Sequence, residues 1–264
     1  MSFIYPLASS SSGNCIYVGD QKQGILIDAG IGIRSFAAHM ALIGIHSKAI
    51  QGIFVTHEHS DHIKGLARIQ QALKVPVYAS RGTLKRLLEK QVLSVQAPMQ
   101  LATGEGVRAG SFQITAFPTP HDCEESQCYR IGLPDGKQVS VCTDLGHMTE
   151  EIHSHLVQSD LVMLESNYEE SLLAVGKYPF FLKRRISGAH GHLSNEDCGK
   201  EIKRLYEAGV KRFVLGHLSE ENNRPELAYA NIVHILGECG AVAAKDFELM
   251  VAPKANQGKW MEIK

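Results

Sequence analysis

The chain has 264 residues, 44% of them hydrophobic, which is enough to bury a sizeable core. Its formal net charge of −1 excludes a uniformly basic surface, so a polyanionic substrate would need a local basic patch or bound metal ions. The six cysteines form no Cys-x-x-Cys pair, which excludes a paired-cysteine zinc knuckle and predicts reduced thiols. We find no signal-peptide pattern and no run long enough to span a bilayer, and therefore predict a cytoplasmic protein without membrane contact.

The first half of the sequence predicts short strands with helices between them. Alternating and β-branched runs predict strands at residues 3–8, 14–19, 23–28, 49–55 and 74–79, with a serine-rich turn at 9–13. Apolar residues at helical spacing predict helices at residues 35–42, 63–73 and 82–90.

The second half begins with a strand at residues 111–118 and a hairpin. The turn Pro134-Asp135-Gly136 between two β-rich runs is a strong hairpin signal and predicts strands at 128–133 and 138–142. Strands and helices then alternate: we expect helices at 149–158, 195–208 and 225–238, and strands at 161–165, 212–215 and 247–251. Because no low-complexity linker divides the chain, we expect one domain over residues 1–264. Strand-rich openings followed by helices in both halves predict two packed sheets with helices outside.

Residues 56–62 carry the strongest chemical signal. They read Thr-His-Glu-His-Ser-Asp-His, which places His57, His59, Asp61 and His62 between a predicted strand and a predicted helix. Side chains alternate along an extended backbone, so His57 and His59 project to the same side. Imidazole nitrogens together with a carboxylate favour a catalytic metal site over a closed structural one. The alternative is a polar loop whose histidines only make hydrogen bonds, but three histidines and an aspartate within six positions favour metal.

Four further residues lie at or just after a predicted strand end: Asp28, His121, Asp144 and His217. Functional side chains tend to lie on loops at the edge of a rigid sheet. This common placement supports one site assembled from distant segments.

These motifs together resemble those of the metallo-β-lactamase superfamily. The spacing His-x-His-x-Asp-His after a hydrophobic strand resembles its signature, and the segments around Asp28, His121, Asp144 and His217 resemble its other motifs in the expected order. Residues 9–15, 165–167 and 191–195 resemble the YycJ/WalJ/VicX-like group within it. The resemblance implies an α/β fold, a four-layer αββα sandwich of two mixed sheets with helices outside.

The resemblance also implies how the ligands divide between two divalent metal ions, zinc or manganese. His57, His59 and His121 would hold one ion, Asp61, His62 and His217 the other, and Asp144 would bridge them. A hydroxide held between the ions would be the nucleophile, with Asp61 orienting it. Asp28 is expected behind the ligands, orienting an imidazole; its alternative is a turn-forming aspartate before Gly30.

His192 is the candidate catalytic residue outside the metal ligands. It precedes a predicted helix start at Ser194, where an anionic phosphate could bind. In related phosphodiesterases a histidine in such a setting is thought to contact the scissile phosphate or protonate the leaving oxygen. A solvent-exposed loop histidine is the alternative. Further candidate phosphate contacts are Ser11, Asn14, Asn167, Lys183, Arg184 and Ser194.

We therefore predict a metal-dependent phosphodiesterase, with DNA as its partner. The resemblance implies a 5′ to 3′ DNA exonuclease related to DNA repair, and we allow for a homo-oligomer of unspecified size. One alternative is a thioester or lactone hydrolase of the glyoxalase II type on the same scaffold, which would not need His192. Another is a non-catalytic metal-binding or redox protein, which His59 disfavours because the superfamily's di-iron branch has a glutamate there.

Overall fold

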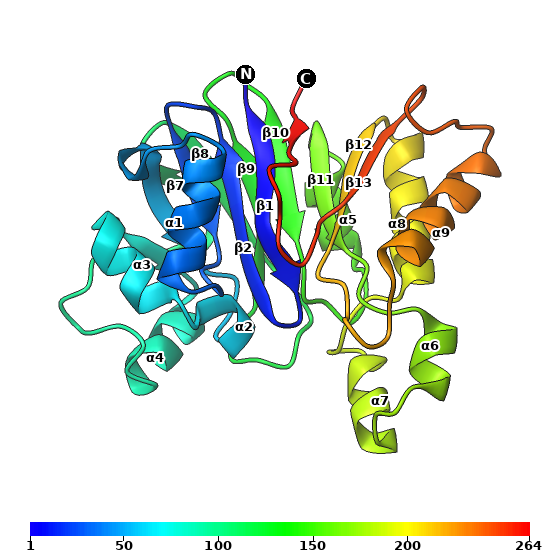
Figure 1. Cartoon of the computed structure of the whole chain (residues 1–264), viewed down its shortest axis with the longest axis horizontal. Helices are drawn as coiled ribbons and strands as arrows, with labels where there is room; N and C mark the ends of the chain where they lie inside the picture. Colours follow the sequence, from blue (N-terminus) through cyan, green and yellow to red (C-terminus); the bar gives the residue numbers. More distant parts are fainter.

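Two seven-stranded sheets pack face to face, with helices on both outer faces (Figure 1). The computed structural model describes the backbone of residues 1–264 and every side chain except that of Glu105. The first sheet runs in the order β14 (Met261–Glu262), β1 (Phe3–Ser10), β2 (Gly13–Gly19), β3 (Gly24–Ile27), β4 (Ile50–Phe54), β5 (Val77–Ala79), β6 (Met99–Leu101). The second runs β13 (Glu248–Val251), β12 (Arg212–Gly216), β11 (Leu161–Glu165), β10 (Gln138–Cys142), β9 (Gln127–Gly132), β8 (Phe112–Pro118), β7 (Gly104–Ala109).

The helices divide between the two halves of the chain. The first half contains α1 (Ile33–Leu42), α2 (Ser60–Ile63), α3 (Leu66–Leu73), α4 (Arg81–Glu89) and a 3₁₀ turn at Ser47–Ala49. The second half contains α5 (Glu150–Leu156), α6 (Glu170–Val175), α7 (Phe180–Ile186), α8 (Asn195–Glu207) and α9 (Pro225–Gly237).

Three buried clusters fill the three spaces between these layers. Side-chain alternation explains the division: Ile53 of β4 packs outward under α1 and α3, whereas its neighbour Phe54 packs between the sheets. The third cluster lies between the second sheet and helices α5, α8 and α9. The predicted four-layer αββα sandwich is therefore confirmed.

The parallel pairing of strands places several connecting loops at one edge of the molecule. Strand β3 runs parallel to β4, and β10, β11 and β12 run parallel to one another, so within each set the loops after the carboxyl ends lie at one edge. In Figure 1, α2 after β4 and α6 after β11 both lie at the lower edge.

The structure corrects several predicted elements. The helix predicted at 63–73 begins only at Leu66, because α2 ends at Ile63. Gly65 lies between the two helices at a close approach that only glycine allows, since a Cβ there would lie 1.7 Å from the Ile31 carbonyl oxygen. The serine-rich turn is only Ser11 and Ser12, since β1 extends to Ser10. Strands β6, β7 and β14 and helices α6 and α7 were not predicted; β14, for example, is two residues long and is defined only by its pairing with β1.

Candidate metal centre

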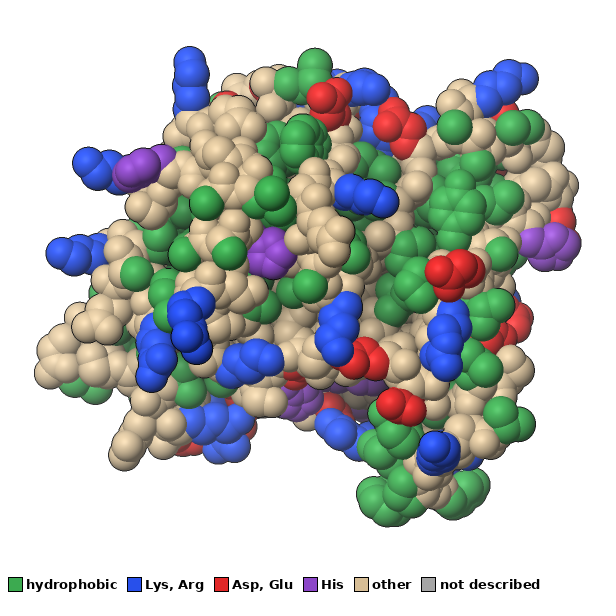
Figure 2. All heavy atoms as spheres, in the orientation of Figure 1, with side chains coloured by type: hydrophobic (Ala, Val, Ile, Leu, Met, Phe, Trp, Pro, Cys, Tyr) green, Lys and Arg blue, Asp and Glu red, His purple; other side chains and the backbone are tan. Residues whose placement is uncertain are grey.

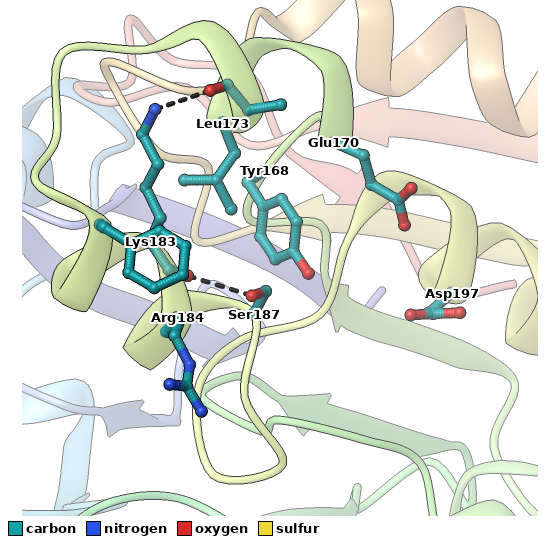
Figure 3. A pocket seen from close by; sticks show the side chains of 9 residues that line it. Tyr168, Glu170, Leu173, Lys183, Arg184, Ser187 and Asp197 are labelled. Atoms are coloured by element: carbon teal, nitrogen blue, oxygen red, sulfur yellow. Dashed lines mark hydrogen bonds between the residues drawn. The ribbon is translucent and has the colours of Figure 1, made fainter.

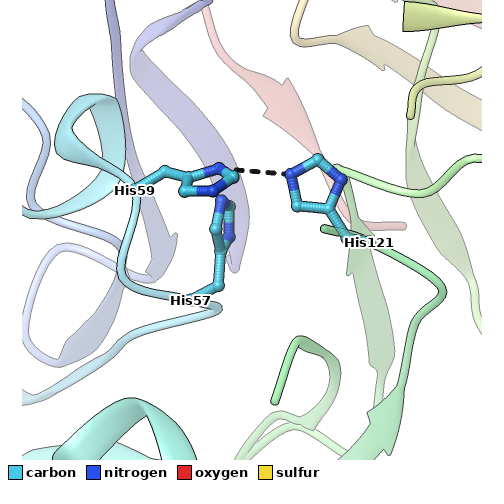
Figure 4. A group of neighbouring side chains, drawn as sticks. All are labelled: His57, His59 and His121. Atoms are coloured by element: carbon cyan, nitrogen blue, oxygen red, sulfur yellow. Dashed lines mark hydrogen bonds between the residues drawn. The ribbon is translucent and has the colours of Figure 1, made fainter. Parts of the chain in front are cut away.

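The loop after β4 and the loop after β8 bring three imidazoles together. His57, His59 and His121 point toward one another (Figure 4), and one ligand nitrogen from each lies within 4.8 Å of the others. Nε2 of His121 lies 3.3 Å from Nδ1 of His59. Thr56 anchors the first loop, because its backbone N–H and its hydroxyl both donate to the buried carboxylate of Asp28.

A second group forms beside the first, from α2 and the loop after β12. Asp61 Oδ2 lies 3.3 Å from Nε2 of His62 and 3.4 Å from Nε2 of His217. Asp144 lies between the two groups: its Oδ2 is 3.2 Å from Nε2 of His62, and its Oδ1 is 3.7 Å from Nε2 of His121. The structure thus brings together all seven side chains predicted as ligands.

Two buried atoms in this cluster, Nε2 of His57 and Oδ2 of Asp144, have no hydrogen-bond partner among the side chains and backbone that the structure describes. A buried polar atom without a partner is costly, and a cation between the two groups would satisfy both atoms. His62 supports the same conclusion, because its Nδ1 lies 2.7 Å from Asp28 Oδ2 and holds the proton there. That leaves the Nε2 lone pair facing the carboxylates of Asp61 and Asp144. The residues present therefore fit divalent metal binding.

The pKa values of the histidines in this cluster also reflect the carboxylates around them. Burial lowers the pKa of His62, but Asp144 and Asp28 outweigh burial and hold that pKa well above its usual range. Burial also lowers the pKa of His217, but Asp144, Asp61 and Glu165 together outweigh burial and raise this pKa to about 10. Burial lowers the pKa of His57 well below its usual range, with His62 the next cause. Both raised pKa values come from the buried carboxylates around His62 and His217, which favour positive charge at this site.

Three of these residues lie at sharp backbone turns. Asp28, Asp144 and His217 have φ angles of 60°, 62° and 54°, in the left-handed region that non-glycine residues seldom adopt. Asp28 directly follows β3, His217 directly follows β12, and Asp144 lies two residues beyond β10. Such backbone strain persists where the surrounding structure requires it, often at functional sites.

Glu165 is a site residue that the sequence analysis did not assign. It ends β11 and is fully buried, and its Oε1 lies 2.8 Å from Nδ1 of both His192 and His217. Its Oε2 accepts backbone N–H groups of Leu145 and Leu193, both at 3.1 Å. Burial raises the pKa of Glu165, but His192 and the hydrogen bonds outweigh burial and lower it. The signal that could have found it is its position at the end of a buried strand.

His192 lies at the metal centre, as expected of the candidate catalytic histidine. Its ring centroid is 5.2 Å from that of His121 and 5.3 Å from that of His217. The side chain is 20% exposed, so it borders the site without being sealed inside the protein. Its chemical role stays a prediction.

The predicted phosphate contacts need correction. Ser194 is fully buried and its hydroxyl caps α8, so it is not available to a substrate. Asn14 and Asn167 are also buried: the amide of Asn14 lies 3.3 Å from Asp61 Oδ2, and that of Asn167 donates to the carbonyl oxygen of His217. Both asparagines therefore support ligands. Ser11 is exposed at the tip of the β1–β2 hairpin.

The basic run on α7, Lys183, Arg184 and Arg185, reaches the metal centre through Arg185, which was not among the predicted phosphate contacts. Lys183 and Arg184 make no ion pair with any described side chain, whereas Arg185 binds Asp122 through two hydrogen bonds of 2.5 and 3.1 Å. Asp122 Oδ1 lies 3.6 Å from Nε2 of His121. Arg185 is thus the member of the run that contacts the rim of the site.

Charged side chains of both signs surround the site. Figure 2 shows histidine side chains at the lower edge of the molecule, with Lys and Arg side chains on both sides of them and Asp and Glu side chains among them. Among the described residues, every helix is too short or too polar to cross a lipid bilayer.

Known proteins are similar to this chain over the region that contains the site residues. Residues 23–218 match the family model described as a beta-lactamase superfamily domain. The chain is 31% identical over 245 residues to exodeoxyribonuclease YycJ of Bacillus anthracis, covering 92% of each chain. It is 32% identical over 246 residues to exodeoxyribonuclease WalJ of Streptococcus pneumoniae, covering 92% of this chain and 91% of the relative.

Solved structures share the fold at low identity. The metallo-β-lactamase fold protein YhfI from Bacillus subtilis matches with a TM-score of 0.70 and 15% identity, covering 99% of this chain and 100% of that one. Zinc-bound PqqB from Methylobacterium extorquens matches with a TM-score of 0.72 and 15% identity, covering 98% and 99%. At this identity the likeness shows the fold alone.

Proposed function

The chain belongs to the metallo-β-lactamase superfamily and within it to the YycJ/WalJ-like proteins, and we propose that this hydrolase is a metal-dependent exodeoxyribonuclease. The observation that carries the proposal is the pair of ligand groups on either side of Asp144, with a sixth histidine, His192, at their border. The names of the relatives and their 92% coverage of this chain support DNA as the substrate. They do not favour a thioester hydrolase or a non-catalytic metal protein.

We assign two divalent ions, zinc or manganese, to the two ligand groups. His57, His59 and His121 would hold one ion, Asp61, His62 and His217 the other, and Asp144 would contact both. Imidazole with carboxylate is a donor set that both metals accept. Such cations make water nucleophilic at neutral pH and neutralise the charge that develops on phosphoryl oxygens.

The protein's own groups orient this site. Asp28 accepts the Nδ1 proton of His62, and Glu165 accepts the Nδ1 proton of His217, so each histidine presents Nε2 to the ligand cluster. Asp61 Oδ2 lies between the Nε2 atoms of His62 and His217, where the carboxylate can also orient a nucleophilic water.

We assign His192 to contact the scissile phosphate or to protonate the leaving group. Glu165 Oε1 accepts from its Nδ1, which fixes the ring, and in the imidazolium form Nε2 then carries the proton that can be donated to a phosphate oxygen or to the departing oxygen. Its partial exposure beside His121 and His217 suits a group that meets substrate at the border of the site. We extend the proposal to 5′ to 3′ polarity and a role in DNA repair, as the family resemblance implies.

The experiment uses the purified full-length protein with single-stranded and duplex oligonucleotides labelled at the 5′ or the 3′ end. Manganese or zinc should support stepwise shortening, and EDTA should abolish it. With a 5′ label, release of mononucleotide at the earliest times indicates 5′ to 3′ polarity. S-lactoylglutathione serves as the competing substrate: thioester hydrolysis with no shortened DNA at any metal concentration would refute the proposed function.

A further inference from the structure

Helices α6 and α7 and the turn between them form a projecting arm, residues 170–186, beside the metal centre (Figure 1). A cavity of about 640 Å³ lies between this arm and the start of α8. Tyr168 and Leu173 line its middle, Lys183 lies on one side, and Glu170 and Asp197 lie on the other (Figure 3). The volume is in the range of cavities that bind small organic groups.

The charges of this cavity are divided between its two sides. Lys183 and Arg184 have no carboxylate within ion-pair distance among the described side chains. The Lys183 ammonium donates to the carbonyl oxygen of Ala174 at 2.7 Å, and the Arg184 guanidinium lies 5.9 Å from the ring centroid of Phe180. Two uncompensated cations beside an aromatic ring suit a phosphate next to a planar base. Glu170, opposite, can accept a hydrogen bond from an exocyclic amino group, whereas Asp197 is already paired with Lys200 and Ser194.

Large apolar side chains at the arm are exposed to solvent. Phe180 is 74% exposed and Phe181 is 73% exposed, and Figure 2 shows hydrophobic side chains at the end of this projection. Exposed aromatic side chains in this number at one place usually mark a binding surface. The adjacent Lys183 and Arg184, which pair with no described carboxylate, favour an anionic partner with aromatic rings.

The arm is attached directly to the rim of the metal centre. Arg185 of α7 binds Asp122, which lies beside His121, and the backbone N–H of His192 donates to the carbonyl oxygen of Ile186 at 2.8 Å. A strand whose phosphate reaches His192 therefore passes close to the end of α7.

We propose that the arm binds an unpaired nucleotide of single-stranded nucleic acid, with its base in the cavity against Phe180 and Tyr168 and its phosphates on Lys183 and Arg184. A base can enter a cavity between helices only when it is unpaired and unstacked, which selects single strands or frayed ends over closed duplex. The inference deepens the proposed function and rests on it for the identity of the substrate.

Fluorescence anisotropy of the full-length protein with a labelled single-stranded oligonucleotide tests the proposal. Phosphorothioate linkages slow hydrolysis during the measurement, and a blunt duplex of equal length is the second probe. Phe180→Ala and Arg184→Ala should each raise Kd for the single strand at least about fivefold, the lower end of what one stacked base contributes. Arg184→Ala should also reduce the slope of log K against log salt by about 0.7.

Two matched controls lie away from the arm. Tyr229→Ala removes an aromatic ring on α9 that is 39% exposed, and Lys245→Ala removes an exposed cation just before β13. Both should leave Kd for the single strand within twofold of the unaltered protein.

The outcomes separate this inference from the proposed function. If the protein binds the single strand through the arm but never shortens unmodified DNA, the function fails and the inference stands. If it shortens DNA while Phe180→Ala and Arg184→Ala bind like the controls, the inference is overturned. It is also overturned if Phe180→Ala converts a dimer to a monomer in light scattering with Kd unchanged, because the arm then joins two copies of the chain.

Discussion

Asp28 Oδ2 lies 2.7 Å from Nδ1 of His62, and both side chains are buried from solvent. Thirty-four positions separate the two residues, and the parallel pairing of β3 with β4 brings them together. Because Asp28 also accepts from the N–H and hydroxyl of Thr56, it fixes the start of the metal-binding loop as well as the imidazole.

Asp28→Asn should weaken metal binding without removing a ligand. The amide is a poorer acceptor for the His62 proton, and loss of such a carboxylate typically lowers metal affinity about 10- to 100-fold. Zinc affinity measured by competition with a chromogenic chelator checks this. Glu226→Gln, at an exposed position in the first turn of α9, is the control, and equal affinity in both variants would contradict the assigned role of Asp28.

Glu165→Gln should impair metal binding and turnover together. One oxygen of Glu165 accepts from both His192 and His217, and an amide cannot hold both rings with the same strength. We expect oligonucleotide cleavage at saturating manganese to fall about 10²- to 10⁴-fold, the range for a misplaced acid–base group. Metal content and initial rates measured on the same preparation test this; normal rates would show that Glu165 does not position either ring.

His59→Ala and His192→Ala should separate binding from catalysis. His59 belongs to the group with His57 and His121, so its loss should reduce bound metal and abolish turnover. His192 belongs to another group of possible ligands, with Asp144, Glu165 and His217, but its Nδ1 already lies 2.8 Å from Glu165 Oε1. Its loss should therefore retain metal while lowering the rate about 10²- to 10⁴-fold. Inductively coupled plasma mass spectrometry gives the metal content. A metal-free His192→Ala protein would make His192 a ligand instead.

Cys239 should be the reactive thiol of the native protein. It is exposed, whereas burial raises the pKa of Cys123 to about 12 and raises the pKa of Cys142 well above its usual range. A higher pKa leaves less thiolate at pH 8, and the thiolate is the nucleophile. Ellman's reagent should titrate one thiol quickly in the native protein and all six after denaturation. Cys239→Ser should remove the fast phase, and two fast thiols in the native protein would contradict this.

The sequence predicted the regular framework because its signals are local. The hairpin around Pro134-Asp135-Gly136 is present as β9 and β10, and the helices predicted at 195–208 and 225–238 end within one residue of α8 and α9. Short-range turn chemistry and helical periodicity depend on neighbouring residues alone. The arm was not predicted, since α6 and α7 are short helices that bury little apolar surface: α7 has no buried residue.

At the site, too, the sequence predicted local features but not long-range contacts. Alternation and strand ends indicated which histidines and aspartates to consider, from His57 to His217. They could not indicate that Glu165 joins His192 to His217, or that Arg185 rather than Lys183 or Arg184 binds Asp122. Those contacts link residues 27 to 63 positions apart.

The amino-acid order alone indicates the candidate metal ligands, their places at strand ends and the layered fold, because residue chemistry, short-range periodicity and the resemblance to metallo-β-lactamase motifs are all readable from it. The folded chain adds which side chains share a proton, which are sealed from solvent and which face the site. These depend on strand pairing and on the left-handed turns at Asp28, Asp144 and His217, and such long-range geometry leaves no periodic trace in the sequence.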